Sequence, residues 1–218
     1  VEAKKNNGGK VIVMLNNSNA MEIDEIKNND GVDAIMEIGF PGGYGFYGVA
    51  DILSGEANPS GHLTDTYAVT NANSPAAQNF GNYEWTNADP SVNINAEEVE
   101  AEDIYTGYKY YETRYADTVL GQGNADATVG SSTGKAWNYD DEVSYPFGYG
   151  LSYTTFEQTL KSVDVELSDR TVTAEVEVKN TGDVAGKDVV QLYTSVPYTD
   201  YDIENKVEKS AVQLLDYE

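Results

Sequence analysis

The sequence predicts two structural units of different class: a layered α/β unit, followed by an all-β sandwich. Over residues 1–70, apolar runs alternate with helix-type patterns, which is the element order of part of an α/β sandwich. Over residues 156–218, apolar and polar residues alternate with period two, as in half-buried strands. Residues 71–155 are polar and rich in Asn and Gly, so we expect an irregular linker with a long loop.

The first unit contains two predicted strands and two predicted helices in alternation. The runs Lys10–Leu15 and Val32–Ile38 are short and predominantly apolar, which is typical of strands buried on both faces of a parallel sheet. Apolar residues spaced as on one helix face favour a short helix over Met21–Ile26 and a longer one over Tyr44–Leu53. Gly55 follows the longer helix and is expected to end it.

Further strands are expected later in the chain, most of them in the second unit. A short one is predicted around Leu63–Val69 and another over Val189–Val196. The intervening alternating positions are Val163, Val165, Leu167, Val172, Ala174, Val176 and Val178. Asp169-Arg170 gives a tight hairpin turn within this series, and residues 180–183 give another turn. Several short strands at this spacing indicate an antiparallel β-sandwich.

The composition restricts the classes of function. The 218 residues include 37 Asp and Glu against 13 Lys and Arg, a formal net charge of −24. Such a chain repels nucleic acid and anionic membrane, whereas a neutral substrate such as a sugar fits it. The acidic residues can also serve solubility alone. Because the chain has no cysteine, disulfides, thiolate metal sites and cysteine nucleophiles are excluded.

The first residues suggest that the chain is part of a longer protein. Residues 1–10 are polar and lead directly into a predicted strand, without a signal peptide. No apolar run reaches the roughly 20 residues that span a bilayer, so no membrane partner is expected. The location stays open between extracellular and cytoplasmic in a bacterium, with extracellular favoured.

Four segments carry motifs that together point to one family. Residues 40–61 contain Phe-Pro-Gly-Gly-Tyr-Gly and then Ala-Asp-Ile-Leu-Ser-Gly-Glu-Ala-Asn-Pro-Ser-Gly. Residues 104–114 read Ile-Tyr-Thr-Gly-Tyr-Lys-Tyr-Tyr-Glu-Thr-Arg, and residues 145–154 read Tyr-Pro-Phe-Gly-Tyr-Gly-Leu-Ser-Tyr-Thr. Residues 176–193 contain Asn-Thr-Gly-Asp-Val-Ala-Gly. In this order they resemble glycoside hydrolase family 3: its second-domain signature, its linker, the block before its β-sandwich and the start of its fibronectin type III-like domain.

The resemblance implies an enzyme with a TIM-like barrel, an α/β sandwich and a fibronectin type III-like, immunoglobulin-type sandwich. It implies an aspartate nucleophile on the barrel and a glutamate acid/base ahead of the strand at Lys10–Leu15. Neither lies in this sequence, so no catalytic residue, cofactor or metal ion is assigned. The chain is then expected to be the non-catalytic portion of a β-glucosidase- or β-xylosidase-like enzyme, which shapes the sugar pocket and supports the barrel.

The expected partners follow from the same resemblance. They are a carbohydrate substrate and the catalytic barrel. The family's sheets are larger than this chain can build, so open edges and uncovered apolar faces are expected. We therefore expect that the chain packs against missing parts, forms a homo-oligomer or swaps elements with a second copy. A carbohydrate-binding module without hydrolysis, or a purely structural module, is the alternative.

The predicted substrate contacts are Gly42, Gly43 and Tyr44 at the start of a helix, and Trp137 in a loop. Free N–H groups at a helix N-terminus bind polar ligands, although these glycines could serve only a tight loop. An exposed tryptophan in a Gly- and Ser-rich loop suits stacking on a sugar ring, and Trp85 lies in a similar setting.

Three other features have competing interpretations. The Tyr-rich segment 105–115 either stacks on sugars or packs the linker between the units, and packing is favoured. His62, the single histidine, is expected to lie at the surface or to hydrogen-bond rather than to catalyse or bind a metal. The acidic run 97–103 is expected to be a solvated face.

Overall fold

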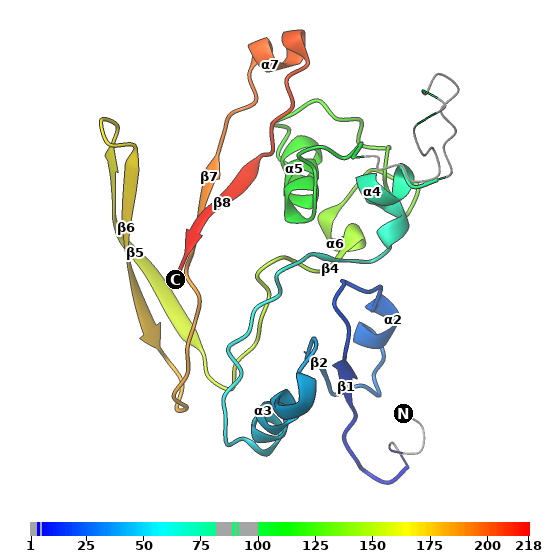
Figure 1. The fold of residues 1–218 in the computed structure, drawn as a ribbon, viewed down its shortest axis with the longest axis vertical. Helices are drawn as coiled ribbons and strands as arrows, with labels where there is room; N and C mark the ends of the chain where they lie inside the picture. Colours follow the sequence, from blue (N-terminus) through cyan, green and yellow to red (C-terminus); the bar gives the residue numbers. More distant parts are fainter. Residues whose placement is uncertain (1–3, 5, 82–88, 90, 92–99) are drawn as a thin grey trace.

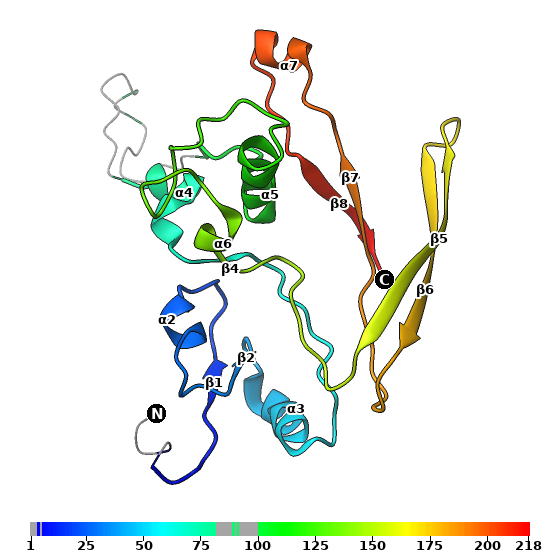
Figure 2. The same ribbon diagram turned by 180° about the vertical axis from the view of Figure 1, so that it is seen from behind.

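The computed structural model describes residues 4, 6–81, 89, 91 and 100–218, which form a mixed α/β chain with four two-stranded sheets (Figure 1). The elements are β1 (Ile12–Leu15), α2 (Asp24–Lys27), β2 (Ala34–Glu37), α3 (Gly42–Ser54), β3 (Tyr67–Ala68), the 3₁₀ helix η1 (Asn71–Asn73), α4 (Pro75–Gln78), α5 (Tyr108–Thr118), α6 (Tyr139–Glu142), β4 (Val143–Tyr145), β5 (Phe156–Glu166), β6 (Thr171–Asn180), β7 (Gln191–Ser195), α7 (Asp200–Asn205) and β8 (Val212–Tyr217). Trp85 and residues 97–99 of the acidic run lie outside the described residues. In both views, α3 and α7 lie at opposite ends of the molecule (Figures 1 and 2).

The two strands predicted near the N-terminus form a parallel pair, β1 with β2, as expected. The expectation that the first is buried on both faces is wrong. Leu15 is 7% exposed, whereas Ile12 and Met14 are 44% and 48% exposed. Successive strand side chains point to opposite faces, and only the face that packs against Ile23 and Tyr67 is covered by the described part of the chain.

The helix predicted over Tyr44–Leu53 is present as α3 and begins at Gly42. Gly55 ends it with φ +84°, a left-handed conformation that glycine adopts without strain. None of the residues of α3 is buried, and Tyr44 and Tyr47 are 85% and 71% exposed. Most apolar side chains of α3, including Tyr44, Phe46 and Tyr47, therefore lie on a surface that no described residue covers.

The linker predicted to be irregular contains an eleven-residue helix, α5. The prediction is wrong there because burial outweighs local propensity: Tyr111 and Arg114 of α5 are 7% exposed. The Arg114 guanidinium donates hydrogen bonds to the carbonyl oxygens of Asp126, at 3.1 Å, and Val129, at 2.6 Å. The helix thus holds the long loop that follows it.

The short strand predicted around Leu63–Val69 is confirmed over the two residues of β3. It pairs antiparallel with β4, with Ala68 opposite Val143. These two residues pack with Tyr111 and Trp137 in a core that α5, α6 and the β3–β4 pair share. The middle of the chain is therefore a packed region with its own core.

The strands predicted after residue 156 are present as two separate antiparallel pairs. β5 and β6 form a long hairpin whose turn includes Arg170 at φ +56°, which confirms the turn at Asp169-Arg170. β7 pairs with β8, and the short helix α7 lies between them in the chain. Apolar side chains on the hairpin, such as Leu160 and Val165, are 61% and 55% exposed. In the described residues the two pairs are not hydrogen-bonded into one sheet.

Candidate functional site: a junction of signature segments and an exposed helix start

A loop held by Glu37 and Asn16 connects β2 to α3. The Glu37 carboxylate accepts hydrogen bonds from the Gly39 N–H at 2.7 Å and the Tyr67 hydroxyl at 3.0 Å. The Asn16 side-chain amide donates to the Gly39 carbonyl at 2.5 Å. Burial and then the Glu37 carboxylate raise the pKa of Tyr67 to about 12, so this hydroxyl keeps its proton as a donor. Glu37 therefore positions the loop that leads to Gly42, a role that the sequence analysis did not assign.

The predicted substrate contacts Gly42, Gly43 and Tyr44 lie together at the exposed start of α3. Gly42 has φ +61°, so a residue without a Cβ suits this position. A Cβ at either glycine would meet no atom within 4 Å, so the space in front of the helix start is open. The first N–H groups of a helix have no intrahelical acceptor. An open helix start beside an exposed tyrosine ring can offer donors and an apolar face to a polar ligand.

Trp137 is not part of this arrangement. The expectation that it is exposed on a loop is wrong, because its side chain is 3% exposed and packs in the core with Tyr111 and Val143. The Arg114 guanidinium lies over the indole, 5.7 Å from the ring centroid. The core thus covers the indole, and no ring face is left for a sugar. A Gly- and Ser-rich sequence does not reveal this burial, since the covering side chains come from α5 and β4.

Tyrosines of the segment 105–115 pack against other elements. The Tyr108 ring lies 4.6 Å from Phe147 and 6.1 Å from Tyr193, centroid to centroid. Its hydroxyl accepts a hydrogen bond from the Leu214 N–H at 3.0 Å, which ties α5 to β8. Tyr111 is buried. For Tyr108 and Tyr111 the packing interpretation is confirmed.

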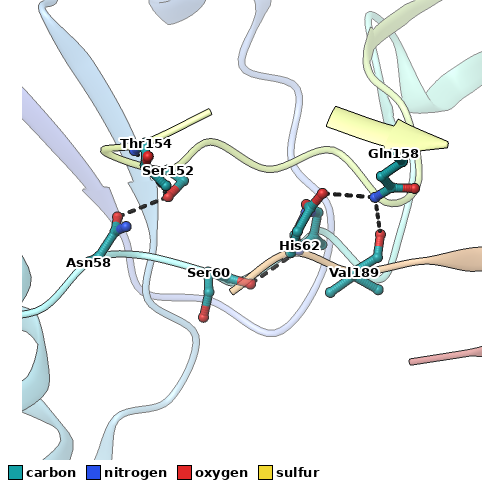
Figure 3. A network of polar contacts seen from close by, with 8 residues as sticks. Asn58, Ser60, His62, Ser152, Thr154, Gln158 and Val189 are labelled. Carbon is teal, nitrogen blue, oxygen red and sulfur yellow. Dashed lines mark hydrogen bonds and ion pairs between the residues drawn. The ribbon is translucent and has the colours of Figure 1, made fainter. Parts of the chain in front are cut away.

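Asn58 joins three of the four signature segments; Figure 3 shows its contact with Ser152. Its side-chain oxygen accepts hydrogen bonds from the Ser152 hydroxyl at 2.9 Å and the Tyr153 N–H at 2.7 Å. Its side-chain amide donates to the Ala185 carbonyl at 3.0 Å. One side chain thus links the Asn-Pro-Ser-Gly turn, the Leu-Ser-Tyr-Thr segment and the turn that follows β6.

His62 lies in the same junction. One ring nitrogen, Nδ1, is 3.1 Å from the Ser60 carbonyl, and the other, Nε2, is 3.9 Å from the Asp188 carboxylate. Gln158 donates to Asp188 at 2.8 Å and to the Val189 carbonyl at 3.1 Å (Figure 3). The expectation that His62 has a hydrogen-bonding role is confirmed.

The junction is closely packed around glycines. A Cβ at Gly150 would overlap the Gly61 carbonyl oxygen and lie 2.9 Å from the His62 ring. A Cβ at Gly186 would lie 2.6 Å from the Asn58 amide. Real Cβ atoms do not approach other heavy atoms so closely, so these positions admit only glycine without a shift.

The described residues include no group of three or more His, Asp or Glu side chains placed to hold a metal ion. None of the described helices has the length and apolar character needed to cross a membrane.

The chain is similar in sequence to one family of enzymes and to several beta-glucosidases. Residues 1–153 match the Glycosyl hydrolase family 3 C-terminal domain. The chain is 33% identical over 196 residues to a beta-glucosidase from Ruminococcus albus, a match that covers 88% of this chain and 16% of that protein. It is 30% identical over 221 residues to thermostable beta-glucosidase B from Acetivibrio thermocellus, covering 100% of this chain and 23% of that protein.

Solved structures are similar over nearly the whole chain. The match to the crystal structure of a beta-glucosidase from Paenibacillus barengoltzii covers 96% of this chain and 19% of that enzyme's chain, with a TM-score of 0.69 and 32% sequence identity. The match to a beta-glucosidase from Kluyveromyces marxianus in complex with glucose covers 99% of this chain and 20% of that enzyme's chain, with a TM-score of 0.64 and 26% sequence identity. The chain thus spans about a fifth of the length of these relatives.

Proposed function

The chain belongs to glycosyl hydrolase family 3, as its C-terminal domain, and from this premise we propose that it is the non-catalytic portion of a β-glucosidase-like enzyme. It shapes one wall of the sugar pocket and supports the catalytic barrel. The observation that carries the proposal is the uncovered apolar surface of α3, where Tyr44, Phe46 and Tyr47 are 54% to 85% exposed. Apolar patches of this kind mark interaction sites in proteins that are otherwise polar at the surface.

The chemistry of hydrolysis is assigned to other parts of the longer protein. Retaining glycosidases need two carboxyl groups roughly 5 Å apart, one as nucleophile and one as acid/base. Glu37 lies at the end of β2 and accepts hydrogen bonds from Gly39 and Tyr67, so we assign it a positioning role. A β-xylosidase-like specificity is equally compatible with the same wall.

The division of the chain is part of the proposal. Residues 1–70 belong to the α/β sandwich, residues 71–155 form the linker, and residues 156–218 form an incomplete fibronectin type III-like domain. The two antiparallel pairs β5–β6 and β7–β8 support the last assignment, because their exposed apolar residues suit the inner faces of a sandwich. In the longer protein, the barrel covers α3. In the isolated chain, a second copy takes its place through association or exchange of elements.

The pocket wall is tested by replacing Tyr44 with alanine in the longer protein that carries this chain. We expect KM for nitrophenyl β-glucoside to rise about three- to tenfold with little change in kcat, because a ring contact made equally in ground and transition states is lost. Tyr201→Ala is the matched control, since Tyr201 is also an exposed tyrosine but lies on α7, at the opposite end of the molecule from α3. Equal effects of the two substitutions, or none, would count against the wall.

A further inference from the structure

A groove of about 850 Å³ is lined by α5, by the loop that follows α5 and by the segments that flank α7. These elements lie at the end of the molecule opposite α3 (Figure 1). The two walls are tied together at several points. The Ala211 N–H donates to the Thr113 hydroxyl at 2.9 Å, and the Tyr105 hydroxyl donates to the Lys209 carbonyl at 3.4 Å. The volume is in the range of small-molecule sites, which are typically 300–1,000 Å³.

One charged side chain of α5, Asp117, lines the groove with unused hydrogen-bonding capacity. No described residue donates a hydrogen bond to the half-buried carboxylate of Asp117, and burial raises the pKa of Asp117 while Arg114 partly opposes this. Arg114 is 7% exposed and donates its terminal N–H groups to the Asp126 and Val129 carbonyls, so it is already committed to the protein. Buried polar groups normally have partners, so the Asp117 carboxylate suits a ligand that donates hydrogen bonds.

The other lining residues indicate what kind of ligand fits. Tyr105, Tyr110 and Tyr198 are half-buried aromatic rings at the groove. Gln122 and Asn124 add exposed side-chain amides, each with donors and an acceptor, that make no hydrogen bond with the described residues. A groove that combines aromatic rings with hydrogen-bond donors and acceptors suits a molecule that has apolar faces and many hydroxyl groups.

The charges at the groove favour a neutral ligand. Lys209 is already paired with Asp202, at 2.8 Å. Lys206 and Glu208 at the rim carry opposite charges, as do Arg114 and Asp117 inside. The chain as a whole has a formal charge of −24, which disfavours anions by long-range repulsion. A cation would find no cluster of three acidic side chains among the described residues.

We infer that this groove is a second carbohydrate-binding site, which takes a neutral oligosaccharide. The Asp117 carboxylate accepts hydrogen bonds from sugar hydroxyls, the exposed amides of Gln122 and Asn124 donate to others, and tyrosine rings contact the apolar sugar faces. This site is separate from the wall at Gly42–Tyr44 and does not depend on the proposed function. It would let the chain hold a glycan that it does not cleave.

The test is calorimetric titration of the 218-residue chain with cellotetraose. Saturable one-site binding is expected. Asp117→Asn and Tyr198→Ala should each weaken it about tenfold or more, as expected for loss of a charge-assisted hydrogen bond or a ring contact. Asp164→Asn on β5 and Tyr217→Ala on β8 are matched controls, because both residues are exposed outside the groove and should leave binding unchanged. Thermal unfolding of each variant establishes that it is folded.

Each outcome decides the inference. Absence of binding, or binding that the groove variants and the controls weaken equally, overturns it. Tyr44→Ala separates this site from the pocket wall: unchanged affinity supports the groove. Loss of binding in Tyr44→Ala with full binding in Asp117→Asn places the sugar at α3, which overturns the groove and leaves the proposed function standing. If Asp117→Asn does not fold, Tyr198→Ala carries the decision.

Discussion

Replacing Asn58 with alanine is expected to destabilise the folded chain by about 2 kcal/mol. The substitution removes three hydrogen bonds and leaves the Tyr153 N–H, the Ser152 hydroxyl and the Ala185 carbonyl without this partner. A buried polar group left unpaired costs about 1–3 kcal/mol. The Ser152 contact is half-buried, whereas Tyr153 and Ala185 lie at exposed positions where water replaces part of the lost bonding, so the sum stays below three full penalties. The measurement is the urea dependence of the circular dichroism signal, from which the free energy of unfolding is obtained.

Two further variants test whether the loss of stability comes from the contacts that Asn58 makes. Asn58→Asp keeps an oxygen acceptor for Tyr153 and Ser152 but loses the donor to Ala185, so a smaller loss, about 1 kcal/mol, is expected. Asn205→Ala removes a single hydrogen bond, to the Tyr201 carbonyl, at an exposed position, and should change stability by about 0.5 kcal/mol or less. If Asn58→Ala were no more destabilising than Asn205→Ala, Asn58 would not join the signature segments energetically.

Replacing Gly150 with alanine is the second substitution with a large expected effect. The added Cβ would overlap the backbone carbonyl oxygen of Gly61 and approach the His62 ring to 2.9 Å. A backbone group cannot turn aside as a flexible side chain can, so the two segments must separate. Overpacking of this kind costs about 1–3 kcal/mol, measured by the same urea titration.

Gly61→Ala is the matched control for Gly150→Ala. It places a methyl group in the neighbouring segment of the same junction, where no atom lies within 4 Å of the new Cβ. We expect a change of about 0.5 kcal/mol or less. Equal stability of the two variants would mean that the close approach of Gly150 to the Asn-Pro-Ser-Gly turn does not constrain the fold.

Local structure near the N-terminus and in the hairpin could be predicted from the sequence. The parallel pair β1–β2 follows from two apolar runs, and the end of α3 follows from Gly55, which tolerates positive φ. The hairpin turn at Asp169-Arg170 follows from the polar break between two alternating runs. These signals act within a few residues, so the sequence expresses them directly. The exposure of Ile12 and Met14 could not be predicted from the sequence, because it depends on which other segments of the chain reach that face of the strand.

The middle of the chain shows why the rest could not be predicted. α5 carries four tyrosines and little helical propensity, and it is stabilised by burial of Tyr111 and Arg114 against residues far away in the sequence. Trp137 occurs in a Gly- and Ser-rich stretch yet is buried for the same reason. Packing against distant residues determines both the helix α5 and the burial of Trp137, and no local sequence pattern predicts such packing.

The candidate site was predictable as a set of segments but not as a set of contacts. The helix start at Gly42–Tyr44 could be placed from the sequence, and in the structure it is exposed. Asn58, in contrast, reads in the sequence as a turn residue, and only the fold brings it to Ser152 and Ala185. An acidic residue at the end of an apolar strand was the available signal for Glu37. Its pairing with Tyr67 required the structure.

The central claim is that this chain shapes a sugar pocket without carrying the catalytic carboxylates. The most direct measurement is hydrolysis of nitrophenyl β-glucoside and nitrophenyl β-xyloside by the purified 218-residue chain, with a mock purification from the same host as control. We predict a rate no higher than that of the mock preparation for both substrates. Saturable turnover that exceeds the mock preparation and scales with the concentration of the chain would contradict it.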